Sequence, residues 1–263
     1  MIDTHCHLTF PEFAGRVAEE LAEAARHGVT GCITISTTPG NALECLQLAT
    51  THRNVWCTAG IHPLYAAEGP FDLEPIRHCI SQERCVAWGE LGLDNHYSDP
   101  PRSLQLPVLE GQLALIKETD AAGGPGAGKP IVLHCRKAFD DLIPILKASG
   151  LGGSRFVFHC FTAGPAEARQ VLDFGAMISY TGVATYKNAP EVMEAAVLTP
   201  ADRIMVETDA PYLSPQPVRG QRPCRPWMVS LTAKLIAEAR GESLKDFERA
   251  TNANAQRFFG VTP

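Results

Sequence analysis

The chain has 263 residues, a net charge of −6 and an isoelectric point near 5.8, which disfavours a protein that coats nucleic acid through a broad basic face. No apolar run approaches the roughly 20 residues of a membrane span, so we expect no membrane association. Met1 opens directly on a strand-like segment without a charged leader, and the nine cysteines are scattered, so we expect a cytoplasmic protein with free thiols.

Strand-like apolar runs alternate with helical patterns along the chain. The sequence predicts strands at eight places: 1–4, 31–35, 55–60, 85–89, 130–133, 155–159, 175–180 and 203–207. Each is followed by a predicted helix: 14–27, 40–52, 72–81, 104–121, 137–148, 164–173, 189–197 and 226–240. A ninth helix is predicted over 243–258, where Ser243 can cap the first turn with Asp246 at the third helical position.

The alternation of strands and helices predicts the fold. It implies parallel strands, and eight repeats favour closure into a (β/α)8 TIM barrel that forms one domain over residues 1–263. The turn-rich stretches 121–128 and 214–220 are interpreted as loops within that domain. An open doubly wound sheet is the alternative. It gives no reason for polar residues from strands one, four, five, six and eight to gather in one place, whereas the mouth of a barrel does.

A His-x-His pair ends the first predicted strand. Side chains two residues apart on a strand point to the same side, so His5 and His7 can present two imidazoles to one divalent cation while Cys6 points away. Such a short motif also occurs by chance. The pair therefore needs further ligands from elsewhere in the chain.

Polar side chains follow other predicted strands, always on the carboxyl side. They are His62, Glu90, His134, His159, Glu207 and Asp209. A carboxylate such as Glu90, which enters the barrel from an apolar strand, is costly to bury unless it is paired or bound to metal. The shared position predicts a metal site at the carboxyl-terminal mouth of the barrel.

Taken in order, the motifs resemble those of the TatD family of metal-dependent deoxyribonucleases, which lie within the amidohydrolase-like barrels. The resemblance runs almost from end to end. It rests on Asp3-Thr4-His5-Cys6-His7, Gly60-Ile61-His62-Pro63, Gly89-Glu90-Leu91-Gly92-Leu93-Asp94, Lys129-Pro130-Ile131-Val132-Leu133-His134-Cys135-Arg136, His159-Cys160-Phe161, Thr185-Tyr186-Lys187-Asn188-Ala189, Val206-Glu207-Thr208-Asp209-Ala210-Pro211-Tyr212-Leu213 and Asn252-Ala253-Asn254-Ala255.

The resemblance implies two divalent cations, Mg²⁺, Mn²⁺ or Zn²⁺, that share a bridging carboxylate. Carried over by motif, the ligands of the first cation are His5, His7, Glu90 and Asp209. Those of the second are Glu90, His134 and His159.

Glu90, Glu207 and Asp209 are the candidate catalytic carboxylates. Glu207 and Asp209 lie two residues apart, so both are expected to reach the site. Asp209 is the better ligand. Glu207 is predicted to orient the attacking water or an imidazole, with a salt bridge at the rim as the alternative.

His62, Arg136 and Lys187 are the candidate substrate-binding residues. His62 can donate to a phosphate oxygen, or it can stabilise the turn at Pro63. Arg136 and Lys187 have motif support as phosphate contacts. Further cationic candidates, each equally explained as a solvated charge, are Arg219, Arg222 and Arg225.

Three cysteines, Cys6, Cys135 and Cys160, flank predicted ligands. Strand alternation predicts that they face the helical layer and have a packing role, although zinc accepts thiolates.

Two segments depart from the family pattern. Pro223-Cys224-Arg225-Pro226 replaces an Asn followed by Glu-Pro, and Asn95-His96 stands where a tyrosine is common. They put substrate preference in question more than metal binding.

The leading hypothesis is a hydrolase that cleaves phosphodiester bonds with a metal-activated water. A monomer is the favoured oligomeric state. The resemblance implies a 3′→5′ exonuclease on DNA ends or single strands, with cleavage at abasic sites as an additional activity. The alternative is a lactonase, amidase or phosphotriesterase on the same barrel. Such relatives often bridge their metals with a carboxylated lysine on strand four, where this chain has Glu90. A binding protein without activity is disfavoured, because every predicted ligand position holds a competent residue.

Overall fold

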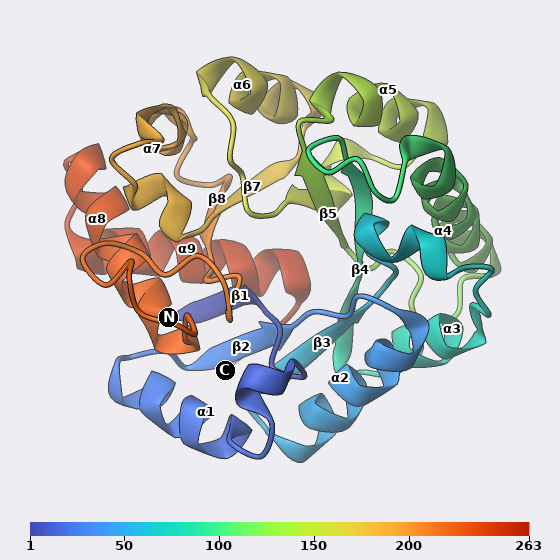
Figure 1. Cartoon of the computed structure of the whole chain (residues 1–263), viewed down its shortest axis with the longest axis horizontal. Coiled ribbons are helices and arrows are strands. Elements are labelled where there is room, and N and C mark those ends of the chain that lie inside the picture. Colours follow the sequence, from blue (N-terminus) through green and yellow to red (C-terminus); the bar gives the residue numbers. More distant parts are fainter. Residues whose placement is uncertain (263) are drawn as a thin grey trace.

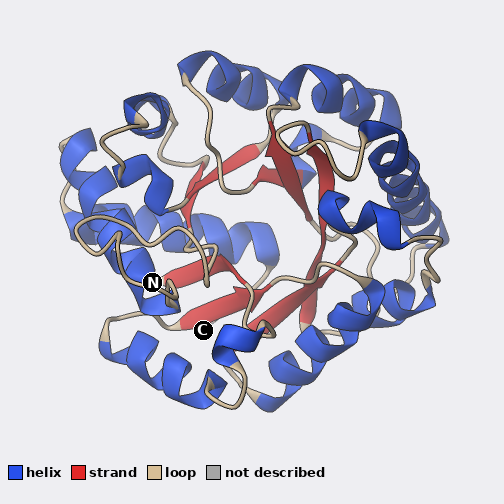
Figure 2. Ribbon diagram, in the orientation of Figure 1, coloured by secondary structure: helices blue, strands red, loops and turns tan. Residues whose placement is uncertain are grey.

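Eight parallel strands pair in chain order and form a barrel (Figure 2), as predicted. The computed structural model describes residues 1–262. The strands are β1 (Ile2–Cys6), β2 (Gly31–Thr34), β3 (Val55–Ala59), β4 (Cys85–Asp94), β5 (Ile131–Arg136), β6 (Phe156–Phe158), β7 (Met177–Tyr180) and β8 (Ile204–Val206). Main-chain hydrogen bonds join the segment after β8 to β1, since the N–H of Asp209 donates to the carbonyl of His5 at 2.9 Å. The barrel is thereby closed.

Helices surround the barrel (Figure 1). They are α1 (Val17–Arg26), α2 (Pro39–Thr51), α3 (Glu74–Ile80), α4 (Arg102–Ala122), α5 (Phe139–Ser149), α6 (Pro165–Phe174), α7 (Pro190–Leu198), α8 (Val229–Arg240) and α9 (Leu244–Phe259). The predicted cap of α9 is confirmed, because the Ser243 hydroxyl accepts the N–H of Asp246 at 3.1 Å. None of the helices within residues 1–262 is long and apolar enough to span a membrane.

An apolar layer fills the amino-terminal end of the barrel. Every strand contributes at least one side chain to it, and these include Ile2, Ile33, Trp56, Val86, Val132, Val157, Met177 and Met205. Helix α9 covers this end, and its Ala255 and Phe259 pack in the same cluster. The Asn254 amide on α9 donates to the carbonyls of Ala201 and Ile204 at 2.8 Å each. Polar interior side chains are left to the opposite, carboxyl-terminal end.

The β4 strand is irregular at the point where it carries Glu90. It runs on through Asp94 instead of ending at residue 89, and its register with β5 shifts between Trp88 and Leu91. Gly89 has a φ of +130°, which side chains with a Cβ rarely adopt. A Cβ on Gly60 of the neighbouring β3 end would lie 2.5 Å from the Gly89 carbonyl carbon. The close approach of two glycines therefore sets the position of Glu90.

We expect Gly60→Ala to displace the backbone at Gly89 and to lower the free energy of unfolding by about 1–3 kcal/mol. Urea denaturation measures this change. Gly40→Ala in α2 is the matched control, because a Cβ there meets no atom within 4 Å. Equal stabilities of the two variants would contradict the account of Gly60.

Candidate metal centre at the barrel mouth

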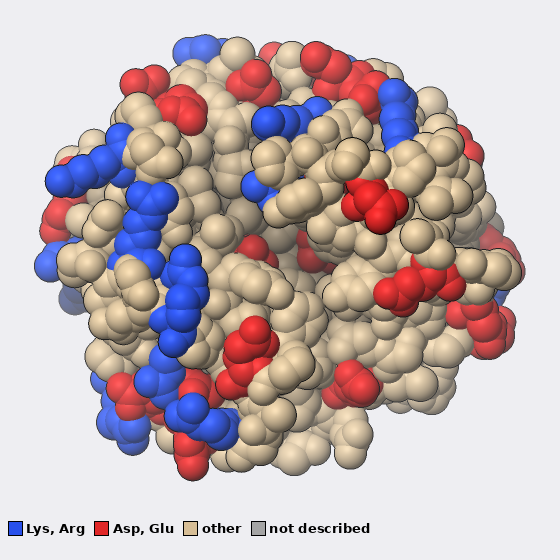
Figure 3. All heavy atoms as spheres, viewed as in Figure 1, with Lys and Arg blue, Asp and Glu red and all other residues tan. Residues whose placement is uncertain are grey.

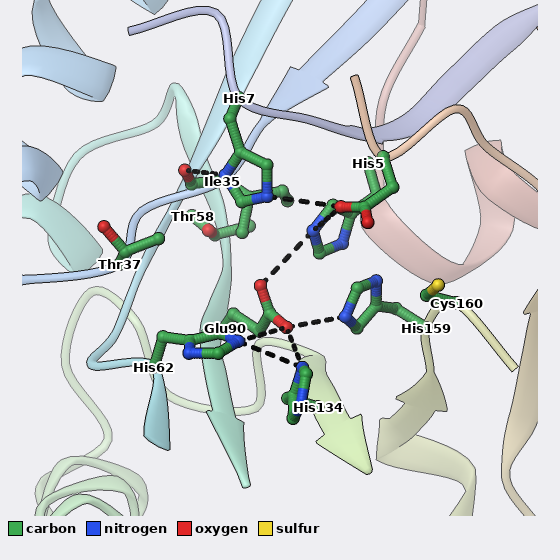
Figure 4. Close-up of polar contacts among 12 residues, drawn as sticks. His5, His7, Ile35, Thr37, Thr58, His62, Glu90, His134, His159 and Cys160 are labelled. Carbon is green, nitrogen blue, oxygen red and sulfur yellow. Dashed lines mark hydrogen bonds and ion pairs between the residues drawn. The ribbon is translucent and has the colours of Figure 1, made fainter. Parts of the chain in front are cut away.

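The barrel mouth brings together all six side chains predicted as metal ligands. They come from five strand ends, and three of them, His5, His134 and His159, contact the carboxylate of a fourth, Glu90 (Figure 4). The cavity above them measures about 900 Å³. The convergence joins residues more than 200 positions apart, as a barrel mouth is expected to do.

Glu90 lies at the centre of the cluster and is almost fully buried. Its Oε1 atom is 2.6 Å from Nε2 of His159 and 2.9 Å from Nδ1 of His134. Its Oε2 atom faces the other way, 3.3 Å from Nε2 of His5. Burial opposes ionisation, but the surrounding histidines, His159 first among them, hold the pKa of Glu90 well below its ordinary value. The two oxygens of one ionised carboxylate thus face two different sets of imidazoles.

Asp209 completes the half of the cluster on the β1 side. Its Oδ1 atom lies 3.3 Å from Nε2 of His7 and 3.6 Å from Nε2 of His5. The residue has a φ of +59°, an uncommon value for a residue with a side chain. Its N–H is held by the His5 carbonyl, which fixes the carboxylate over the His-x-His pair.

Three of the histidines are held through one ring nitrogen, so that the other faces the carboxylates. The partners are the Ile35 carbonyl for Nδ1 of His7 (3.2 Å), Asp94 Oδ2 for Nε2 of His134 (2.8 Å) and Glu207 Oε1 for Nδ1 of His159 (3.1 Å). Each partner is an acceptor and therefore fixes a proton on the nitrogen that it contacts. The remaining nitrogens face Glu90 and Asp209. In the neutral rings these nitrogens carry the lone pairs that a cation would bind, which is the arrangement of metal-binding histidines.

His5 gives a direct test of whether a cation fits. Both of its ring nitrogens are buried and form no hydrogen bond within residues 1–262. Burial, and then the neighbouring His159, lower the pKa of His5, so the ring is neutral. A buried nitrogen without a partner between two carboxylates, Glu90 and Asp209, matches the requirements of a metal ligand. The residues present therefore fit divalent cations.

Glu207 lies behind His159 rather than facing the cavity. Its Oε1 atom also accepts the N–H of Cys160 at 2.6 Å, and its Oε2 atom accepts the Thr4 hydroxyl at 3.4 Å. Of the two roles predicted for Glu207, this position supports the orientation of an imidazole. The alternative of a salt bridge at the rim is wrong, because the side chain is buried.

Asp94 orients the His134 ring, as Glu207 orients His159, although the sequence motifs alone assigned it no role. Burial opposes its ionisation, but hydrogen bonds from His134 and from the N–H groups of Tyr97 and His96 lower its pKa to about 2. The spacing of four residues between Glu90 and Asp94 was a signal of this role in the sequence, because strand residues an even number of positions apart face the same side. The pairing of Asp94 with Arg136, which brings Asp94 beside β5, was not readable from the sequence.

His62 differs from the other histidines of the cluster. Its Nδ1 atom accepts the N–H of Leu64 at 3.0 Å, so in the neutral ring the proton is on Nε2. Burial lowers the pKa of His62 to about 3, which keeps the ring neutral. The Nε2 atom lies 3.0 Å from Nδ1 of His134 and 3.4 Å from Glu90. His62 thus stabilises the turn at Pro63 and also presents a hydrogen-bond donor to the site.

The cationic candidates separate into two groups. Arg136 lines the cavity, whereas Lys187 is exposed and lies outside the residues that line it. Arg225 was a candidate phosphate contact, but it forms a bidentate ion pair with buried Glu20, at 2.7 and 3.0 Å. Arg219 lies over the Tyr186 ring, 3.8 Å from its centroid.

The predicted orientation of the flanking cysteines holds for Cys6 and Cys135 but not for Cys160. Its thiol is buried and contacts the Ile33 carbonyl at 3.5 Å. Cys135 shares its strand face with Ile131 and Leu133 and packs in the core cluster that includes Phe139 and Leu142 of α5.

Cys160 lines the cavity, so the prediction that it faces the helical layer is wrong. Cys160 lies beyond the end of β6 with a φ of +43°, where strand alternation no longer applies. Burial, and then the neighbouring Asp209 and Glu207 carboxylates, raise its pKa well above the ordinary value.

The two departures from the family pattern have different positions. Cys224 is fully buried, and its N–H donates to the Pro211 carbonyl at 2.8 Å. His96 is exposed and lines the cavity, whereas the Asn95 amide is held by the Lys137 carbonyl and by Asp141. Of these residues, His96 is therefore placed to contact a substrate.

Comparison with known proteins agrees with this geometry. A sequence profile of the family described as TatD related DNase matches residues 2–260. The chain belongs to the TatD family. It is a metal-dependent hydrolase of the TatD type.

Relatives in this family span the whole chain. An uncharacterized metal-dependent hydrolase of Escherichia coli K12, YcfH, is 33% identical over 264 residues, which cover 99% of this chain and 96% of YcfH. The 3′-5′ ssDNA/RNA exonuclease TatD of Erwinia amylovora is 32% identical over 269 residues, which cover 99% of this chain and 100% of that protein. The crystal structure of the TatD homologue YJJV from Escherichia coli K12 superimposes with a TM-score of 0.90 at 29% identity, covering 100% of this chain and 98% of YJJV.

We expect Asp94→Asn to weaken metal binding by about 10- to 100-fold, because the amide no longer holds the His134 ring with a negative charge. Competition with a chromophoric chelator measures the affinity. Asp173→Asn, on the exposed side of α6, removes the same charge away from the site and serves as the control. If both variants bind metal as the unmodified protein does, Asp94 does not position His134.

Proposed function

We propose that this TatD-family hydrolase holds two divalent cations and hydrolyses phosphodiester bonds at the ends of single-stranded DNA, as a 3′→5′ exonuclease. The observation that carries the proposal is the orientation of Glu90. One of its oxygens faces His134 and His159, and the other faces His5. A carboxylate placed in this way is suited to bridge two cations, each completed by its own histidines.

The protein side chains have distinct parts in this chemistry. Bound divalent cations supply the Lewis acidity that lowers the pKa of water and stabilises charge on phosphoryl oxygens. Glu90 and Asp209 supply the negative charge that retains the cations. His62 directs its Nε2–H into the cluster and donates to a phosphate oxygen. Glu207 keeps the proton of His159 on Nδ1, so that Nε2 stays available.

The substrate class is supported by charge and by the relatives. Figure 3 shows acidic atoms within the central hollow and a line of basic side chains on one side of the mouth, over the loop from β8 to α8. That loop carries Arg219, Arg222 and Arg225, of which Arg225 is paired with Glu20. Two cations add +4 at the mouth of an acidic protein and attract phosphate locally. Relatives named 3′-5′ ssDNA/RNA exonuclease span the whole chain, and cleavage at abasic sites extends the same chemistry.

The ligand set also bears on the metal and on the oligomeric state. Four imidazoles with two carboxylates favour Zn²⁺ or Mn²⁺ over Mg²⁺, because imidazole is a poor ligand for Mg²⁺. All six ligands come from one chain, which supports an active monomer.

The proposed function is tested by metal analysis of the purified protein and by digestion of end-labelled single- and double-stranded DNA with Mg²⁺, Mn²⁺ or Zn²⁺. We expect about two metal ions per chain and release of nucleotides from the 3′ end of the single strand. Turnover of lactones or amides without cleavage of DNA would favour the alternative hydrolase.

We expect Glu90→Gln to lower the metal content and to reduce kcat/KM by more than about 100-fold, because an amide cannot supply charge to both cations. The loss of activity should exceed the 10- to 100-fold that is usual when a residue that hydrogen-bonds to a metal ligand is replaced. Metal analysis and the nuclease assay are the measurements, with Glu68→Gln, an exposed residue outside the cavity, as the control. Near-normal metal content and turnover would refute the bridging role.

We expect His62→Ala to lower kcat by about 100- to 1,000-fold, as when one donor to a developing negative charge is removed. Arg136→Ala should instead raise KM with little change in kcat, the result of losing uniform substrate binding. Steady-state kinetics on a single-stranded oligonucleotide separates the two effects. Lys147→Ala, at an exposed position of α5 outside the cavity lining, is the control. A His62 variant that changes only KM would contradict the donor role.

A further inference from the structure

Two exposed tyrosines lie at the barrel mouth. Among the large hydrophobic side chains exposed within residues 1–262, only Tyr97 and Tyr212 are aromatic, and they are 48% and 49% exposed. Both line the central cavity. Tyr97 follows β4 and Tyr212 follows β8, strands on opposite sides of the barrel (Figure 1). Exposed aromatic rings that border a binding cavity indicate a ligand with flat, apolar faces.

Tyr212 contacts the half of the cluster that is formed by β1 and the segment after β8. Its N–H donates to the Asp209 carbonyl at 2.9 Å. Its ring lies edge-on to Phe10, with centroids 6.2 Å apart, and Phe10 in turn stacks on His7 at 4.6 Å. A flat group on Tyr212 would therefore lie beside the predicted ligands His7 and Asp209.

Tyr97 is attached to the other half of the cluster. Its N–H donates at 3.0 Å to Asp94, the residue that holds the His134 ring. The Arg136 guanidinium carbon lies 5.2 Å from the Tyr97 ring centroid, and Nη1 lies 3.4 Å from the hydroxyl. A cation next to an aromatic ring suits a ligand that combines a base with a phosphate. Each tyrosine is thus connected to one predicted metal position.

We propose that Tyr97 and Tyr212 stack the bases on the two sides of the scissile phosphodiester, an inference that rests on the proposed nuclease function. The cavity lies between the two rings, with Glu90 among its lining residues. Base stacking tolerates any sequence, because every base has an aromatic face. It requires bases that are free to leave their neighbours, as they are in unpaired strands. The enzyme therefore selects unpaired nucleic acid by base faces and not by base identity.

The test uses an end-labelled single-stranded DNA oligonucleotide and two matched oligonucleotides, in which an abasic nucleotide replaces either the terminal or the penultimate nucleotide. The variants are Tyr97→Ala, Tyr212→Ala and the corresponding phenylalanine substitutions. Val197→Ala, at an exposed position of α7 outside the cavity lining, is the control. Circular dichroism and metal content establish that each variant is folded and loaded.

Each alanine variant should lose about 5- to 150-fold in kcat/KM on the intact oligonucleotide. The phenylalanine variants, which keep the ring, and Val197→Ala should retain the activity of the unmodified protein. On the oligonucleotide that lacks the base facing a given tyrosine, the effect of its alanine substitution should disappear.

Two results overturn the stacking role while the nuclease function stands. One is an unchanged kcat/KM for both alanine variants when the unmodified protein degrades DNA. The other is an equal loss on intact and abasic oligonucleotides. If the unmodified protein degrades no nucleic acid at all, the nuclease function fails, and the stacking role fails with it.

Discussion

The structure of the site depends on one buried carboxylate. Glu90 is almost inaccessible to solvent and yet ionised, because histidines from four strand ends or loops surround it. A buried charge is costly unless opposite charge or hydrogen bonds compensate it. The cluster supplies imidazoles whose free nitrogens point inward. Glu90 and these imidazoles together create a demand for cations, and the TatD-type dependence on metal follows from it.

Hydrogen bonds from the histidine rings to surrounding acceptors give the site its geometry. A neutral imidazole can place its proton on either nitrogen, and only one tautomer can bind metal in a given orientation. Asp94, Glu207 and the Ile35 carbonyl each hold one ring in the tautomer that fits. His62 has the opposite arrangement, since its outer nitrogen accepts and its inner nitrogen donates. The same residue type thus provides ligands and a donor within a few ångströms.

The barrel separates stability from chemistry along its axis. The apolar layer and α9 occupy the amino-terminal end, while the opposite end is free to hold polar side chains on strand ends and loops. Three of the residues with uncommon backbone conformations at the site, Gly89, Cys160 and Asp209, lie at strand ends or irregularities. Strain of this kind persists where surrounding contacts fix it, and here the paired strands provide those contacts.

The sequence by itself determined the barrel and the convergence of the predicted ligand residues at its mouth, because both are expressed in local patterns. Alternating apolar runs predict parallel strands, and polar residues after strands converge wherever such strands close. The tertiary structure decided which groups hydrogen-bond to the predicted ligands and orient them. Asp94 reaches His134 only through the register of β4 with β5, and Glu207 turns toward His159. Cys160 enters the cavity and Arg225 pairs with Glu20, because backbone direction beyond a strand end and contacts between distant segments are not encoded in local periodicity.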